Sequence, residues 1–242
     1  GFAALNRGDL ATAGEACKQA LAANQKHVPA HFLVGLVALE GKQRQVAHEA
    51  FKSVITLDRD HAAAWAHLAK LNVGEGRIAA AESALREVRR IQPSDPMVIE
   101  LTGTVLNSLG EYEAAELFFE RAHQMVPQSP SALMNLGNVR VFLGKIDEAV
   151  ALFKRAIELE PNSAQCHWGL ANSEKAKDES HIKTMQGLID SGRQSKRSQG
   201  FLHYAIGKEN EDLGNWADAF SAFTQGAKAR RETVEFSEAD EA

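Results

Sequence analysis

Two stretches of the chain decide its fold: LGEYEAAELFFERAHQMVP at residues 109–127 and LGKIDEAVALFKRAIELEP at residues 143–161. Both carry alanine and phenylalanine at the same places and end in proline, and the second begins 34 residues after the first. A looser copy, LGNWADAFSAFTQGAKARR at residues 213–231, begins 70 residues after the second, two more than twice 34. A fixed period of this size indicates stacked copies of one structural unit.

The period extends over nearly the whole chain when a 34-residue frame is started at Ala62. Position 8 of the frame holds a small residue in successive copies: Gly35, Ala69, Gly103, Gly137, Ala171 and Gly207. Position 20 holds alanine: Ala47, Ala81, Ala115, Ala149 and Ala219. Position 24 holds a large apolar residue: Phe51, Leu85, Phe119, Phe153 and Phe223. These spacings form two helical stripes, one on each helix of a hairpin, and the small residues let the two helices approach closely.

The ends of the helices are also marked. Glycine near position 15 breaks the chain between the two helices of a hairpin, at Gly76, Gly110, Gly144 and Gly214. Proline at position 32, as at Pro93, Pro127 and Pro161, ends the second helix and positions the next hairpin.

This pattern resembles the tetratricopeptide repeat family. The resemblance implies an all-α fold, a right-handed superhelical solenoid of about six to seven helix-turn-helix hairpins, with the first helix of each pair lining a concave face. We expect one solenoid domain over residues 1–242: a truncated first repeat at 1–27, four regular repeats at 28–163, an irregular repeat at 164–199, a last repeat at 200–233, and an acidic tail or linker at 234–242. The hairpins are expected to begin near Val28, Ala62, Pro96, Pro130, Ala164 and Gly200.

Composition narrows the class of partner. The net charge is −5, and the last eleven residues alone carry five unopposed negative charges, so the remainder of the chain is near neutral. Nucleic-acid binding needs clustered lysine and arginine, so no nucleic-acid partner is expected. No apolar run reaches the length of a membrane-spanning helix, so no membrane partner is expected either. Two distant cysteines favour a reducing compartment, and we expect a cytoplasmic protein.

Motifs of catalysis and cofactor binding do not occur. The glycines lie at helix crossings and turns, and neither a phosphate-binding loop nor a dinucleotide fingerprint is present. His27 and His31 have the spacing of a metal-binding pair, but a third ligand is missing and His27 precedes its helix, so no metal site is expected. The sequence therefore predicts a non-catalytic chain with no cofactor.

The remaining candidate surface is the concave face formed by positions 5, 9 and 12 of each first helix. Apolar and aromatic residues stand there beside amides and a cation, which suits the capture of an extended peptide. The predicted peptide-binding residues are Met134, Asn138, Trp168, Asn172, Tyr204 and Lys208. The alternative interpretation is that such positions pack between neighbouring first helices.

Apolar residues at the same positions near the N-terminus predict a second surface, made of Phe2, Leu5, Phe32, Leu36 and Leu39. It would bind a partner helix, a second copy of the chain, or residues preceding Gly1. Because a half-helix start exposing Phe2 and Leu5 is a poor cap for a solenoid, we expect either preceding residues or a partner that covers this end.

The period breaks in KAKDESHIKTMQGLIDSGRQSKRSQG at residues 175–200, where Lys183 replaces the alanine of position 20 and SGRQSKRSQG is expected to be a loop. One interpretation is a decayed repeat with a longer linker. The other is a resemblance to the end of the repeat region in bacterial tetratricopeptide–sulfotransferase proteins, carried by Ile182, Met185, Leu188, Leu202, His203, Ala205, Gly207, Asp212, Gly214, Ala219 and Phe223. The phosphosulfate loop of that family does not occur in this chain, so its activity does not transfer.

Two functions follow as hypotheses. The first is a protein-interaction scaffold that binds a peptide or protein segment in its concave groove. The second is an N-terminal module that positions substrate or mediates assembly for a bacterial sulfotransferase domain beyond residue 242.

Overall fold

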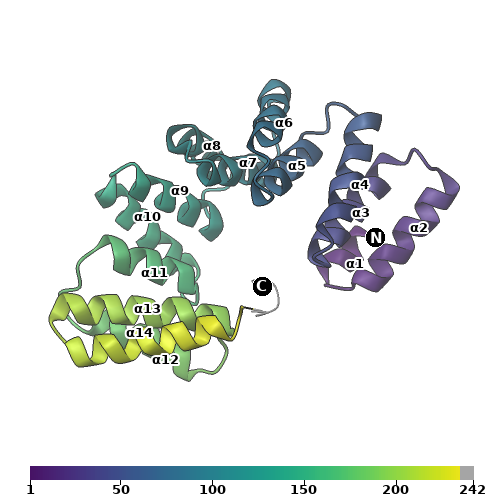
Figure 1. The fold of residues 1–242 in the computed structure, drawn as a ribbon. Coiled ribbons are helices and arrows are strands. Elements are labelled where there is room, and N and C mark those ends of the chain that lie inside the picture. Colours follow the sequence, from purple (N-terminus) through teal and green to yellow (C-terminus); the bar gives the residue numbers. More distant parts are fainter. Residues whose placement is uncertain (235–242) are drawn as a thin grey trace, which may run out of the picture. The chain divides into compact units, whose positions relative to one another are not determined.

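The computed structural model describes residues 1–234, and every regular element in that range is an α-helix (Figure 1). The prediction of an all-α fold is confirmed. The chain divides into two compact units, Gly1–Ala122 and His123–Ala242, each with its own packed helices. The expected acidic tail, apart from Val234, lies outside the described residues.

Helical hairpins build the first unit, with α1 packed on α2, α3 on α4, and α5 on α6. Their bounds are α1 (Phe2–Asn6), α2 (Leu10–Ala23), α3 (Val28–Glu40), α4 (Arg44–Leu57), α5 (Ala62–Gly74), α6 (Ile78–Ile91), α7 (Pro96–Ser108) and α8 (Tyr112–Met125, whose last residues pass the boundary of the unit). The first helices of successive hairpins also contact one another, as α5 does with α7.

The regular hairpins are closed by a large side chain seated against a small residue. A Cβ atom added to Gly103 would lie 2.7 Å from the Phe119 ring, and one added to Gly137 would lie 2.8 Å from the Phe153 ring. Where the small residue is Ala69, the partner in the frame is the smaller Leu85, and both are buried. The frame therefore conserves the summed volume of the two positions, as close packing requires.

The helix ends follow the predicted signals. Gly76, Gly110, Gly144 and Gly214 all have φ between 70° and 79°, a left-handed conformation that glycine adopts without the Cβ clash. The helices α6, α8 and α10 (Ile146–Leu159) each end two residues before the proline of position 32. Five predicted hairpin starts, from Val28 to Ala164, coincide with the first residue of a helix.

The second unit contains the break in the period. Its helices are α9 (Pro130–Phe142), α10, α11 (Ala164–Ser173), α12 (Ser180–Asp190), α13 (Lys196–Leu213) and α14 (Trp216–Arg231). The α13 helix begins at Lys196, inside the stretch expected to be a loop, and not near Gly200. The Ser195 side chain accepts a hydrogen bond from the Ser198 backbone N–H, which caps the helix early.

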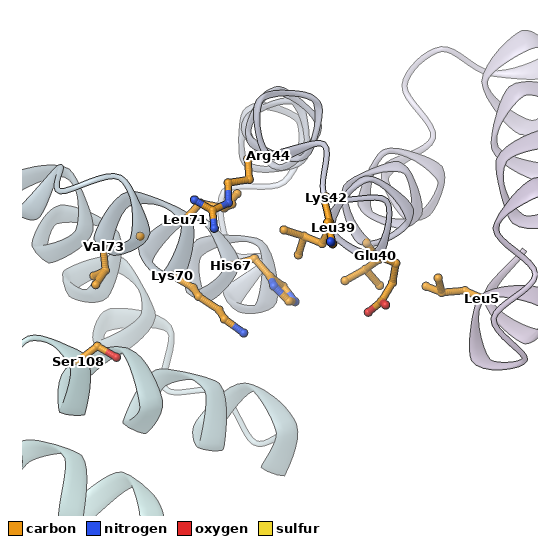
Figure 2. Close-up of a pocket in the computed structure, with 12 residues that line it drawn as sticks. Leu5, Leu39, Glu40, Lys42, Arg44, His67, Lys70, Leu71, Val73 and Ser108 are labelled. Carbon is orange, nitrogen blue, oxygen red and sulfur yellow. The ribbon is translucent and has the colours of Figure 1, made fainter. Parts of the chain in front are cut away.

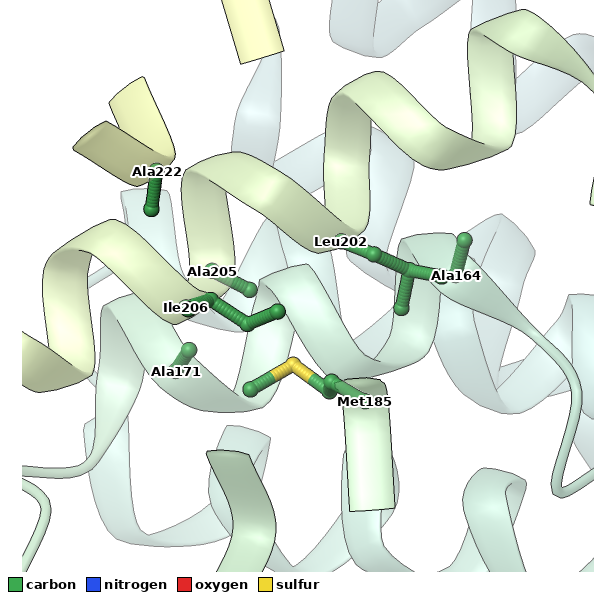
Figure 3. Close-up of a cluster of buried hydrophobic side chains, with 7 residues drawn as sticks. All are labelled: Ala164, Ala171, Met185, Leu202, Ala205, Ile206 and Ala222. Carbon is green, nitrogen blue, oxygen red and sulfur yellow. The ribbon is translucent and has the colours of Figure 1, made fainter. Parts of the chain in front are cut away.

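The irregular segment is integrated by an apolar cluster. Met185 of α12 is fully buried among residues of α11, α13 and α14 (Figure 3). The cluster consists of Ala164, Ala171, Met185, Leu202, Ala205, Ile206 and Ala222. Because α11 and α13 also pack directly on each other, α12 is attached to a hairpin core that does not depend on it alone.

The glycine-to-phenylalanine contact predicts that two glycine-to-alanine variants change the free energy of unfolding in opposite directions. We expect Gly103→Ala to lower the free energy of unfolding by about 1–3 kcal/mol, because the new methyl group overlaps the Phe119 ring. Gly14→Ala, in the interior of α2 with nothing within 4 Å of the added Cβ, should raise it by about 0.5–1 kcal/mol. Urea unfolding of both variants measures the difference, and equal effects of the same sign would contradict the packing argument.

Candidate functional site

A pocket of about 880 Å³ opens in the first unit where the C-terminal halves of its first helices converge (Figure 2). Its lining residues are Leu5, Leu36, Leu39, Glu40, Lys42, Arg44, His67, Lys70, Leu71, Val73, Gly74 and Ser108. Most belong to α1, α3, α5 and α7, the helices that the repeat frame assigns to the inner face. We call it the first-unit pocket.

The repeat frame explains why these residues meet. Leu36 and Lys70 occupy position 9 of their repeats, and Leu5, Leu39 and Val73 occupy position 12. Positions 9 and 12 are three residues apart, so they lie on one face of each helix. Stacking successive first helices brings Leu5, Leu36, Leu39 and Val73 together as an apolar floor, with Lys70 beside it.

Charged side chains line the same pocket, with three cations against one carboxylate: Lys42, Arg44 and Lys70 against Glu40. Arg44 and Lys70 form no ion pair within residues 1–234. Figure 2 shows Glu40, His67, Lys70 and Leu5 turned toward a common open space. The pocket therefore joins an apolar floor to an excess of positive charge, which favours a ligand with aliphatic and acidic groups.

His67 forms part of the wall as a neutral ring. It stacks on Phe51 with ring centroids 4.9 Å apart and an interplanar angle of 6°, and its Nδ1 is buried without a hydrogen-bond partner in the described residues. Burial, followed by the charges of Lys70 and His61, lowers the pKa of His67 to about 4. At neutral pH the imidazole is therefore uncharged and adds no fourth cation.

Lys42 departs from the repeat pattern at the edge of the pocket. It stands at position 15, where five other repeats, including the truncated first one with Gly8, have glycine, and it adopts a left-handed φ of 56°. An L-residue with a side chain is strained there by about 1 kcal/mol or more. A cation is thus placed at a position where glycine would be more stable.

The predicted N-terminal surface divides into three parts. Leu5, Leu36 and Leu39 line the first-unit pocket. The Phe32 ring instead lies 4.7 Å from the His61 ring and 5.6 Å from the Phe51 ring, measured between centroids, so it belongs to an aromatic cluster. Phe2 is exposed and does not line the pocket.

The predicted peptide-binding residues of the second unit are engaged to different degrees. Met134 packs against the buried Leu133, Ala156 and Cys166, and Asn138 is half-buried. Trp168 is 37% exposed with its ring edge-on to Phe201, and the Asn172 amide donates to the Trp168 carbonyl at 2.7 Å.

The last two members of that set lie on α13. The Tyr204 ring lies 6.4 Å from the Phe223 ring, and the Lys208 Nζ contacts the Asp212 Oδ1 at 2.5 Å. Of the six, Trp168 and Asn172 are exposed. Their role in binding stays a prediction.

The other chemistry-bearing side chains have structural partners. The His27 Nδ1 accepts a hydrogen bond from the Ala30 N–H and caps α3, and the His31 Nε2 donates to the Gln25 carbonyl. No group of three potential metal ligands occurs within residues 1–234. Cys17 and Cys166 are buried and unpaired, and burial raises the pKa of both thiols, so neither is a thiolate nucleophile at neutral pH.

Sequence reasoning missed the cations Lys42 and Arg44. Both lie in or next to the short turn between α3 and α4, outside the stripe formed by positions 5, 9 and 12. The signal that would have found one of them is the replacement of the position 15 glycine by Lys42.

The family profile described as tetratricopeptide repeat matches residues 38–103 and 106–173, more than half of the chain. The chain therefore belongs to the tetratricopeptide repeat family. A comparison with curated proteins found no match.

Several solved structures share the fold at low identity. YrrB, described as a TPR protein with an unusual peptide-binding site, matches with a TM-score of 0.56 and 16% identity over 86% of this chain and 98% of its own. Pseudomonas aeruginosa pilF matches with a TM-score of 0.62 and 21% identity over 81% of this chain and 88% of its own. Human IFIT1, solved as a dimer with m7Gppp-AAAA, matches with a TM-score of 0.72 and 16% identity over 92% of this chain and 55% of its own.

The neutral His67 predicts an acid sensitivity of the first unit. Because its folded pKa lies below that of an unfolded histidine, its contribution to stability is complete above about pH 6.5 and is lost as the pH falls toward 4. The loss amounts to roughly 2–3 kcal/mol over that window. Urea unfolding of the full chain at pH 7 and pH 4.5 should show a smaller acid loss for His67→Leu than for the wild type. The more exposed His31→Leu serves as the control, and an unchanged acid loss in His67→Leu would contradict the assignment.

Proposed function

We propose that this chain is a non-catalytic scaffold whose first-unit pocket binds an extended protein segment that carries aliphatic and acidic side chains. The observation that carries the proposal is the pocket itself, where leucines form the floor and cations outnumber the carboxylate. Aliphatic side chains of a bound segment would gain about 25 cal/mol per Å² of apolar area removed from water. Its carboxylates would meet Arg44 and Lys70, which form no internal ion pair within residues 1–234.

The strain at Lys42 supports a binding role for this end of the pocket. Proteins retain locally unfavourable residues mainly where function requires them, since selection for stability alone would favour glycine. The peptide-binding description of YrrB adds a precedent for the fold, although an identity of 16% extends it no further.

The charge of the pocket can be tested by reversal. A phage library of random heptapeptides is panned against the full chain, and the selected peptides are synthesised for calorimetry. We expect these peptides to combine Asp or Glu with Leu, Ile, Val or Met. Lys70→Glu should weaken their binding about tenfold, because one attraction becomes a repulsion in a partly buried site. The matched control is Arg86→Glu, an exposed arginine on α6 outside the pocket, which should bind as the wild type does.

Three results would contradict this site. Equal weakening by Lys70→Glu and Arg86→Glu would show a non-specific charge effect. Weakening by Trp168→Ala with Tyr204→Ala, and not by Lys70→Glu, would move the site to the second unit. Binding of a triphosphate-bearing oligonucleotide without any peptide binding would replace a protein ligand with a nucleic acid.

Substitution of Lys42 tests whether a residue that strains the backbone also contributes to peptide binding. Lys42→Gly should raise the free energy of unfolding by about 1 kcal/mol while weakening the selected peptides. The control is Gln92→Gly, the other non-glycine residue with positive φ in the described chain, which lies outside the pocket. It should stabilise the fold to a similar degree and leave peptide affinity unchanged. A Lys42→Gly variant that binds normally would remove Lys42 from the site.

A second function, the N-terminal module of a bacterial sulfotransferase, stays a hypothesis. One observation favours it: Trp216 and Phe220, one turn apart on α14, are 69% and 75% exposed and form an apolar surface that a following domain would cover. The coding sequence after residue 242 tests it, because a Gly/Ser/Thr-rich phosphosulfate loop with arginine supports the module and a stop codon contradicts it.

We infer a cytoplasmic site of action from the two buried, unpaired thiols. Among the described helices, none combines the length and apolarity needed to cross a bilayer.

A further inference from the structure

Three titratable side chains form a line of hydrogen bonds inside the second unit. His167 of α11, His181 of α12 and Glu209 of α13 are joined by a 2.7 Å contact between His167 Nδ1 and His181 Nε2, and a 2.5 Å contact between His181 Nδ1 and Glu209 Oε1. The far nitrogen of His167, Nε2, lies 2.9 Å from the Pro161 carbonyl oxygen. His167 is 1% exposed and Glu209 is 4% exposed, so the line is largely shielded from water.

The geometry determines how many protons the line holds. The Pro161 carbonyl can only accept, so His167 Nε2 must donate. Three arrangements then complete every bond. In the first, both imidazole rings are neutral and Glu209 is protonated. In the second, His181 is an imidazolium and Glu209 is a carboxylate. In the third, His167 is an imidazolium, His181 is neutral and Glu209 is a carboxylate. Each arrangement contains three protons and has no net charge.

Any other number of protons breaks a bond. With two protons, one of the three contacts has no proton. The break falls between His181 Nδ1 and the Glu209 carboxylate, between His167 Nδ1 and His181 Nε2, or between His167 Nε2 and the Pro161 carbonyl. With four protons, the N–H of His167 Nδ1 points at the N–H of His181 Nε2 across 2.7 Å. A buried polar group that loses its partner in this way is costly. Glu209 Oε2 is already buried without a partner in the described residues, so the site has little capacity for an unbalanced charge.

Within residues 1–234, the charges that act on His167 come from the line itself. Burial lowers the pKa of His167, and the only charged neighbours that shift it are His181 and Glu209. Several titratable groups on or beside the surrounding helices are paired with one another: Lys154 with Glu174, Lys183 with Glu179, Lys208 with Asp212, and Arg140 with Glu148. His203 and Asp218 line a neighbouring cleft.

That cleft, of about 310 Å³, shows what depends on the line. Ile182 and Gln186 of α12 and the preceding Glu179 form one wall of it, and residues of α13, α14 and the turn between them form the rest. The α12 helix is held by an apolar attachment, in which Ile182, Leu188 and Ile189 pack around the buried Met185, and by a polar attachment at His181. The polar attachment lies in the N-terminal turn of α12, beside the wall residues Glu179 and Ile182.

We propose that His167, His181 and Glu209 form a proton-coupled latch that holds α12 against α11 and α13 and thereby keeps the cleft closed on one side. In the docked state the three groups hold three protons. In the undocked state at neutral pH, two neutral imidazoles and a carboxylate hold two, so docking takes up one proton. Rising pH therefore weakens docking above the ordinary histidine pKa of about 6.5.

At acidic pH the proton change on docking has the opposite sign. Well below pH 6.5 both undocked histidines are protonated and the undocked groups hold four protons, so docking releases one proton and weakens again. The docking equilibrium is therefore strongest near pH 6.5, where the average number of protons bound by two free histidines and the carboxylate equals three.

Glu209→Gln isolates the latch from every other titrating group. The introduced amide donates to His181 Nδ1, which completes the line with two protons and no ionisable group at this end. The docking constant of the wild type divided by that of Glu209→Gln should therefore fall about tenfold for each pH unit between pH 5.5 and 7.5. The probe is the Met185 methyl resonance of the full chain, which is assigned by its disappearance in Met185→Leu. The urea concentration at which this resonance reaches the midpoint of its change is measured across this pH range.

Glu211→Gln is the matched control, because it removes an exposed carboxylate from the same helix. The docking constant of the wild type divided by that of Glu211→Gln should not change with pH. A ratio for Glu209→Gln that is independent of pH, or an equal slope for Glu211→Gln, overturns the latch.

A second measurement serves if Glu209→Gln does not fold. In the ¹⁵N-histidine-labelled wild type at pH 6.5, a single proton between His167 Nδ1 and His181 Nε2 should give a scalar coupling between these nitrogens. Its absence at pH 6.5 overturns the proposal.

Discussion

The seating of a phenyl ring against a glycine on the facing helix is the constraint on which the rest of this structure depends. At Gly103, Gly137 and Gly207 an added Cβ would fall 2.6–2.8 Å from the partner ring, so each hairpin closes only because that atom is absent. The contact fixes how closely the two helices approach. It thereby fixes the spacing of the first helices, whose inner faces form the floor of the first-unit pocket.

The pocket arises where this regular scaffold carries irregular chemistry. In the first unit, Leu5, Leu36, Leu39 and Val73 at positions 9 and 12 supply an apolar floor, and a floor of that kind selects weakly between partners. The charges Lys42, Arg44 and Lys70 add the discrimination, and one of them stands in a left-handed conformation at the expense of stability. His67 shows the opposite adjustment, because its burial removes a charge and leaves the cations around it with less repulsion.

The second unit departs from the repeat in another way. Between α11 and α13 the alanine of position 20 is lost, and α12 is held by a buried polar line together with an apolar cluster around Met185. Hydrophobic contacts tolerate small shifts and changes of pH, whereas a buried line of hydrogen bonds tolerates neither. The two-residue slip in the period therefore replaces a standard apolar hairpin with a segment whose attachment depends on protonation.

The sequence by itself determined the all-α class, the period, five of the hairpin starts and the glycine turns, because each depends on residues close together in the chain or on a repeated code. It also predicted that Leu5, Leu36 and Leu39 share a surface. Tertiary structure alone decided that Phe32 belongs to an aromatic cluster, that Lys42 and Arg44 reach the same pocket, and that α13 begins at Lys196. It alone brought together His167, His181 and Glu209, which lie 14 and 28 residues apart. No local pattern encodes such a meeting, since it depends on how three helices pack where the repeat code is interrupted.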